Sequence, residues 1–146
     1  MHKPYGRLLI MALSSFLSMY VLMYAMVNQA SNVLPNLNQT YMAGLMTAPM
    51  LLIEVLLMRA MYPDRRRNVV VLAVSLVLGI ACFVAIRRQA AIRETQFLKS
   101  MIPHHASAIL MCENAELESD QAKTLCQAII SSQSSEIQQM KQMLSR

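Results

Sequence analysis

The sequence lacks the signatures by which many enzymes are recognised. It contains no P-loop, glycine-rich fingerprint, internal repeat or low-complexity run, so neither nucleotide binding nor a repeat architecture is indicated. Trp is absent, and only 14% of the residues are charged although 55% are hydrophobic. No charge at all occurs from Leu8 to Val27. Uncharged blocks of this length are typical of a membrane protein rather than of a soluble core.

Three apolar blocks are each long enough to cross a bilayer, which takes about 20 residues. They lie at about 8–27, 41–62 and 69–86, and the sequence therefore predicts an all-α membrane domain over residues 1–88. A signal peptide is the alternative for the first block, because Lys3 and Arg7 precede it. Its apolar stretch is longer than a usual signal sequence, and no small-residue cleavage site follows it, so we expect a retained anchor.

The basic residues predict the orientation of this domain. Lys3 and Arg7 precede the first block and Arg59–Arg67 lie between the second and third, whereas the Asn28–Thr40 loop is uncharged. The N-terminus is then cytoplasmic and the tail extracytoplasmic, in a multi-pass protein of a bacterial inner (plasma) membrane. Arg87 and the basic residues after it oppose this assignment. The net charge of +5 comes from membrane-flanking residues, so we expect a lipid bilayer and no nucleic acid as partner.

Residues 89–146 form a second, extracytoplasmic domain in this interpretation. The pattern is helical from Gln89 to Leu117, with a kink or restart expected at Pro103. Ser119 is a good N-cap for a second helix that runs to about Leu144, so the tail is predicted to be an antiparallel hairpin. A turn centred there places Cys112 opposite Cys126, as a disulfide or as two buried thiols, and His105 opposite Gln133.

One stripe of the first tail helix carries donors for a soft metal ion. Met101, His104, His105 and Met111 follow helical spacing, and Cys112 lies beside them. Thioether with imidazole suits Cu(I) or Ag(I) and does not suit Mg²⁺ or Ca²⁺. The facing helix would bring up Glu136, Met140 and Gln133. The alternative is structural, with Glu136 and His104 forming a polar contact that holds the helices together.

Other features of the membrane domain have two interpretations each. Methionines lie along one face of each of the first two blocks, where they could form a path for soft metal ions or serve as flexible packing residues. These methionines are Met19, Met23, Met26, Met42, Met46 and Met50. Glu54 lies inside the second block, where it would handle metal or protons or face a polar group such as Ser14 or Ser15 of the first. Cys82 is expected to be a small apolar filler.

The run from Phe97 to Ala108, with Met101-Ile102-Pro103-His104-His105 at its centre, is followed by Gln133, Glu136-Ile137 and Met140. Over about residues 95–145 the chain resembles the CopM-like, copper-associated family of ferritin-like bacterial proteins, domain-of-unknown-function family three hundred and five. The resemblance implies a ferritin-like helical fold and copper or silver tolerance outside the cytoplasm. Carried over by position, it implies these metal ligands: Met101, His104, His105, Met111, Glu136 and Met140.

Together these patterns predict a membrane-anchored protein that binds Cu(I), or Ag(I), for copper or silver homeostasis and tolerance. We expect no catalytic residues. A ferritin-like di-metal redox enzyme is the alternative, but no acid stands three residues before either tail histidine, as such sites use. A metal-free membrane scaffold is the third possibility. Because one hairpin exposes part of its apolar stripe, we expect a homodimer or higher oligomer that closes a four-helix bundle.

Overall fold

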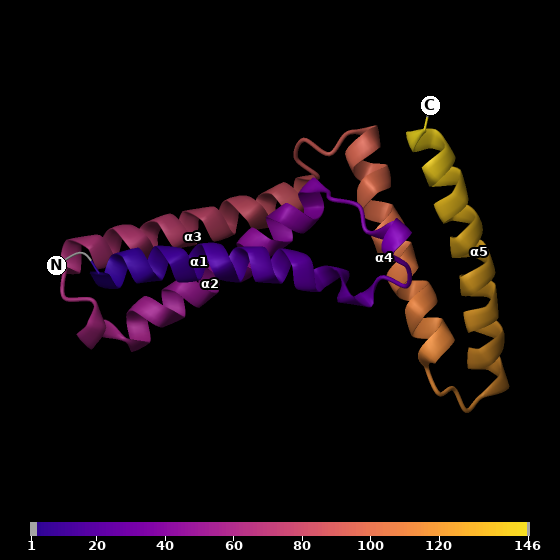
Figure 1. Ribbon diagram of the computed structural model, residues 1–146, viewed down its shortest axis with the longest axis horizontal. Coiled ribbons are helices and arrows are strands. Elements are labelled where there is room, and N and C mark those ends of the chain that lie inside the picture. The colour runs from indigo at the N-terminus through magenta and orange to yellow at the C-terminus, as the bar shows by residue number, and fades with distance from the viewer. Residues whose placement is uncertain (1–2, 146) are drawn as a thin grey trace. The chain divides into compact units, whose positions relative to one another are not determined.

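The structure is a computed structural model that describes residues 3–145. Over this range the chain is all-helical and contains no strand, as predicted. The helices are α1 (Lys3–Leu22), α2 (Leu37–Leu57), α3 (Arg65–Arg88), α4 (Glu94–Asn114) and α5 (Asp120–Leu144), with short 3₁₀ turns η1 (Met23–Met26), η2 (Ala30–Asn32) and η3 (Arg59–Met61). They form two compact units (Figure 1). The helical unit comprises α1 and Asn38–Ala90, and the tail unit comprises Met23–Leu37 with the chain from Ala91 onward.

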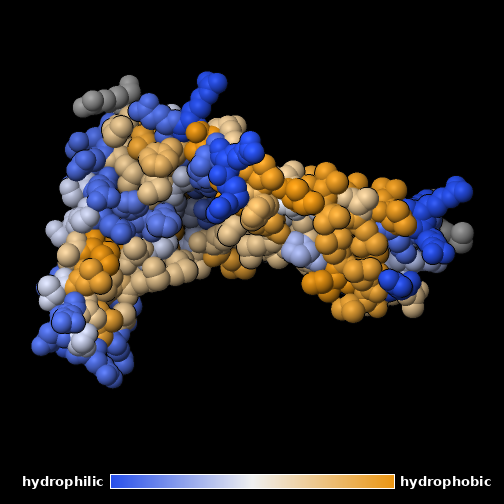
Figure 2. Space-filling view, turned by 180° about the vertical axis from the view of Figure 1, so that it is seen from behind, coloured by the Kyte–Doolittle hydropathy of each residue, from blue (hydrophilic) through white to orange (hydrophobic). Residues whose placement is uncertain are grey.

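Within the described residues, three helices are long and apolar enough to cross a membrane. The segments are Pro4–Met26, Leu37–Leu57 and Arg65–Arg88, each at least as long as the roughly 20 residues that a bilayer requires. Figure 2 shows apolar side chains covering much of the helical unit and giving way to hydrophilic ones at its end. The second segment begins four residues before the predicted range of 41–62. It also ends earlier than predicted, because η3 and the loop after Leu57 interrupt the helix.

Small residues let α2 and α3 approach closely. A Cβ atom added at Gly44 would lie 2.8 Å from the Cys82 Sγ atom, and one at Gly79 would lie 3.1 Å from the Ala48 Cβ. Ser75 of α3 is also buried. Close contact between small residues is a common way for helices to pack in a membrane. Cys82 is a free thiol that fills this space, which agrees with its predicted role as a small filler.

A hydrogen-bonded group ties the start of α1 to the connection between α2 and α3. The Tyr5 hydroxyl donates to Asn68 Oδ1 at 2.9 Å and accepts from the Asp64 backbone N–H at 3.1 Å. The Tyr62 hydroxyl donates to Glu54 at 3.0 Å, so Glu54 has a polar partner from the loop rather than from Ser14 or Ser15. The contact suits a carboxylate near the end of an apolar helix, where an unpartnered charge would be costly.

The tail forms the predicted antiparallel hairpin. Ser119 caps α5, since its hydroxyl accepts from the Ala122 N–H at 3.2 Å, and α5 ends at Leu144 as expected. The first tail helix begins later than predicted, because Gln89 and Ala91 adopt positive φ angles of 48° and 58° and break the chain between α3 and α4. It also continues through Pro103 without a restart.

Buried apolar residues join α4 to α5 in what we call the seam cluster. Its members are Leu98, Ile102, Ala106 and Ile109 of α4 with Ile137 and Met140 of α5, and partly buried Val27, Leu34, Met101, Ile130 and Leu144 pack against it. Burying one such large aliphatic side chain stabilises a fold by about 1.5–3 kcal/mol. Val27 and Leu34 belong to the connection between α1 and α2, which therefore lies in the tail unit and not in the predicted membrane domain of residues 1–88.

Candidate soft-metal site

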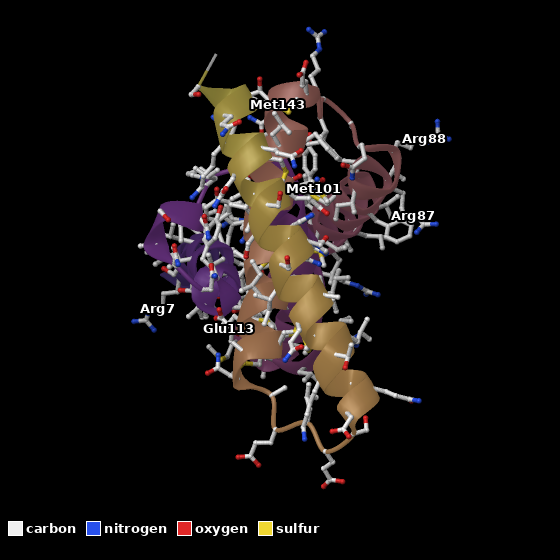
Figure 3. The ribbon with its side chains drawn as sticks, turned by 90° about the vertical axis from the view of Figure 1, so that its right-hand side faces the viewer. Arg7, Arg87, Arg88, Met101, Glu113 and Met143 are labelled. Carbon is white, nitrogen blue, oxygen red and sulfur yellow. A yellow bond between two sulfur atoms is a disulfide. The ribbon has the colours of Figure 1, made fainter. Side chains whose placement is uncertain are left out.

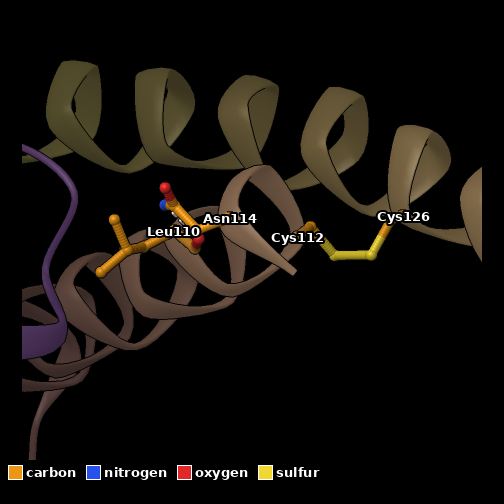
Figure 4. Close-up of a disulfide and its surroundings, with 4 residues drawn as sticks. All are labelled: Leu110, Cys112, Asn114 and Cys126. Atoms are coloured by element: carbon orange, nitrogen blue, oxygen red, sulfur yellow. Dashed lines mark hydrogen bonds between the residues drawn. A yellow bond between two sulfur atoms is a disulfide. The ribbon is translucent and has the colours of Figure 1, made fainter. Parts of the chain in front are cut away.

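A disulfide fixes the pairing of α4 with α5 near the turn. Cys112 and Cys126 are bonded, with their Cα atoms 5.2 Å apart (Figure 4). These are the two cysteines that the predicted turn at Ser119 places opposite each other, so the disulfide alternative is confirmed in this structure. Farther from the turn, the contacts between the helices depart from this pairing by about one helical turn.

The central contact of the hairpin joins His105 to Glu136. The His105 Nε2 atom lies 2.7 Å from Glu136 Oε2, and the imidazole side chain is only 11% exposed. The sequence placed Gln133 opposite His105; Glu136 lies one helical turn farther along the same side of α5, so the register is offset by a turn. The structural alternative named His104 as the partner of Glu136, and the structure assigns that contact to His105.

Hydrogen bonds on both sides hold the Glu136 carboxylate. The Ser132 hydroxyl donates to Oε1 at 2.8 Å, and His105 contacts Oε2. The hydrogen bond from Ser132, then that from His105, lower the pKa of Glu136 below its usual range. The carboxylate is therefore charged at neutral pH. Ser132 was not singled out in the sequence, although its position four residues before Glu136 on a helix is a usable signal.

Both nitrogens of His105 face acceptor atoms. Nδ1 lies 3.0 Å from the Met101 carbonyl oxygen, and Nε2 faces the Glu136 carboxylate. A neutral imidazole has one N–H and satisfies one of these acceptors, whereas an imidazolium donates to both. A metal ion that binds one nitrogen of His105 must therefore displace the acceptor that faces this nitrogen, while the other nitrogen keeps an N–H for its own acceptor.

Two methionines lie one turn beyond this contact. Met101 precedes His105 by one turn of α4, and Met140 follows Glu136 by one turn of α5. Because the helices are antiparallel, the His105–Glu136 contact places Met101 level with Met140, and both belong to or pack against the seam cluster. Figure 3 shows Met101 and Met143 toward the same end of the hairpin and Glu113 toward its turn.

The other two predicted ligands, His104 and Met111, lie away from the seam between α4 and α5. The His104 side chain is exposed, and its ring centroid lies 6.0 Å from that of His105. Met111 is 52% exposed and stands six residues beyond His105, about 9 Å along the helix at ~1.5 Å per residue. The candidate set therefore divides into an inner group, which is buried His105 and Met140 and partly buried Met101 with Glu136 beside them, and two outlying residues.

Gln133, expected near the ligands, lies on the inner side of α5. Its Oε1 atom is buried and has no hydrogen-bond partner. Within residues 3–145, no group of three or more His, Cys, Asp or Glu side chains gathers as a metal site. The candidate set itself combines imidazole and carboxylate with thioethers.

Comparison with known proteins places this hairpin in a family. Residues 84–144 match the family described as "Domain of unknown function (DUF305)". The chain is also 31% identical over 140 residues to "Uncharacterized protein L153" of Acanthamoeba polyphaga mimivirus, across 94% of this chain and 90% of that protein. The chain carries a DUF305 domain and belongs to the same family as the viral protein. No solved structure matches it.

The DUF305 match begins near the end of α3 and covers α4 and α5. It confirms the resemblance of about residues 95–145 to domain-of-unknown-function family three hundred and five, and it contains all six predicted ligands. The Met23–Leu37 segment of the tail unit lies outside the DUF305 match, although the similarity to the viral protein extends over 94% of the chain.

Proposed function

We propose that this protein binds Cu(I), and Ag(I) as an equivalent soft ion, in the seam between α4 and α5. The observation that carries the proposal is the His105–Glu136 contact, at 2.7 Å, which brings the thioethers of Met101 and Met140 level with each other one turn away. Two thioethers and one imidazole form a donor set that prefers Cu(I) to harder ions. The role is to buffer or pass on the ion in copper or silver homeostasis and tolerance.

Glu136 has a secondary role in this proposal. Its carboxylate is a hard donor that Cu(I) does not prefer, and it already orients the His105 ring. We propose that the contact between Glu136 and the Nε2 atom of His105 breaks when metal binds, while the hydrogen bond from Ser132 to Glu136 remains. His104 and Met111, exposed on the same helix, are then points of entry for the ion rather than buried ligands.

The competing functions have less support from the site. A ferritin-like di-metal enzyme would need carboxylates from several helices, and the side chains three residues before His104 and His105 are Met101 and Ile102. A metal-free scaffold would use the His105–Glu136 contact only to hold the hairpin. The scaffold function also includes the His105–Glu136 contact, but it assigns no role to Met101 and Met140.

We further propose that the three apolar helices anchor the site to a bacterial plasma membrane, with the N-terminus cytoplasmic. The basic residues at the starts of α1 and α3 support this orientation against Arg87 and Arg88 at the end of α3, and the disulfide suits an oxidising compartment for the tail. Two hairpins would associate into a ferritin-like four-helix bundle. Apolar side chains left exposed on the hairpin support that association, namely Phe97, Met111, Leu125 and Met143.

Metal content separates the three functions. We expect the full chain, purified in detergent without added metal from cells grown with copper, to carry copper in amounts comparable to the protein. Iron in that preparation would support the di-metal enzyme. Preparations that contain no metal and acquire none on incubation with Cu(I) would support the scaffold and refute the proposed function.

A further inference from the structure

The connection between α1 and α2 docks on the hairpin. Turns η1 and η2 both contact α4, and Val27 and Leu34 pack against the seam cluster. The Tyr24 hydroxyl donates to the Leu34 carbonyl at 2.8 Å and closes the loop on itself. Met23–Leu37 is therefore a third wall of the tail unit, supplied by a part of the sequence outside the DUF305 match.

Pro103 creates one of the acceptors on which this segment docks. A proline inside a helix has no N–H for the carbonyl four residues earlier, which here belongs to Lys99. The Asn36 side-chain amide lies 3.5 Å from that carbonyl oxygen, within hydrogen-bond distance, and Asn36 is buried. The next residue, Leu37, donates its backbone N–H to Gln96 at 3.0 Å. The proline of the Met-x-Pro-His-His motif thus helps to hold the loop.

These contacts place the loop at the level of the two paired methionines. On α4 it touches Gln96 and Lys99, which precede Met101 by five and two residues, within about one and a half turns. On α5, Lys141 donates to Ser31 at 3.4 Å, and Lys141 is the residue after Met140. The loop therefore crosses the hairpin where the proposed metal ligands lie, and away from the disulfide end.

We propose that Met23 and Met26 of η1 complete the coordination of the soft ion, an inference that rests on the proposed function. Residues three apart lie on one side of a 3₁₀ turn, so Met23 and Met26 share one side of a turn that contacts α4. Met26 is 48% exposed and precedes Val27, which packs against the same cluster as Met101. The site is then built from α4, α5 and η1, and the hairpin alone is incomplete.

The test uses the full chain in detergent with Cu(I) as the probe. Met23→Leu with Met26→Leu keeps the side-chain volume and removes both sulfur atoms. We expect the Cu(I) affinity to fall by about tenfold or more, which is roughly 1.4 kcal/mol. X-ray absorption of the copper-loaded variant should show fewer sulfur neighbours around copper than in the wild-type chain.

Met58→Leu with Met61→Leu is the matched control, because this pair has the same spacing at η3 in the helical unit. It should bind Cu(I) as the wild type does. Asn36→Leu, which removes the amide that reaches the Lys99 carbonyl, should weaken binding in the same direction as the η1 variant. Wild-type affinity and sulfur content in the η1 variant would overturn the inference and leave the proposed function standing. A wild-type chain that binds no Cu(I) would refute the proposed function itself.

Discussion

Replacing Met101 and Met140 with leucine is expected to lower the Cu(I) affinity of the full chain by about 100-fold, or roughly 2.7 kcal/mol. Leucine fills nearly the same volume, so the seam cluster should remain packed while both thioethers are lost. The affinity is measured in detergent by competition with a Cu(I) chelator. Helix content and thermal unfolding of the variant, followed by circular dichroism, show whether the fold is retained.

Met143→Leu serves as the control for this pair. Met143 lies on α5 three residues beyond Met140, is 47% exposed, and belongs neither to the residues packed against the seam cluster nor to the η1 turn that contacts α4. It should bind Cu(I) with unchanged affinity. If the Met101/Met140 variant also keeps the wild-type affinity while remaining folded, the paired methionines are packing residues and the proposed site is wrong.

Breaking the Cys112–Cys126 disulfide should destabilise the hairpin by about 3 kcal/mol, since the bond closes a loop of 14 residues in the unfolded chain. This is a large share of the stability available to a small domain. Cys112→Ser with Cys126→Ser should therefore raise amide hydrogen exchange in α5 by about 100-fold relative to the wild type. Mass spectrometry of peptides from the two proteins measures this difference.

Cys82→Ala provides the comparison, because Cys82 is a free thiol in the helical unit. It should leave the exchange of α5 unchanged and the 112–126 crosslink intact in peptide maps made without reductant. Equal protection of α5 in the disulfide-free variant and the wild type would show that packing in the seam holds the hairpin without the bond.

Local sequence patterns were sufficient to predict the helices and the position of the hairpin turn. Three apolar blocks predicted α1 to α3, and Ser119 marked the start of α5 because a hydroxyl at that position caps a helix. The position of the turn also predicted the Cys112–Cys126 pairing, because only seven residues separate each cysteine from Ser119 and an error in the register is small over that length. The prediction weakened with distance from the turn. Glu136, rather than Gln133, meets His105 there.

The docking of Met23–Leu37 could not be read from the sequence. Its contacts combine the apolar side chains of Val27 and Leu34 with single polar groups, such as Asn36 on the carbonyl of Lys99, 63 residues away along the chain. The break at Gln89 and Ala91 was missed because positive φ angles at non-glycine residues leave no periodic signal. The continuity of α4 at Pro103 also depends on the tertiary structure, which supplies a donor for the carbonyl that the proline frees.

Titration of the purified full chain with Cu(I) and, separately, with Zn(II) tests the central claim most directly. Thioether donors bind soft monovalent ions and are rarely used by zinc, so Cu(I) should bind far more tightly than Zn(II), with Met101, His105 and Met140 protected from chemical modification when copper is present. Binding of Zn(II) as tight as that of Cu(I), or Cu(I) binding that leaves these three side chains as reactive as in the metal-free chain, would contradict the claim that the seam of the hairpin is a soft-metal site.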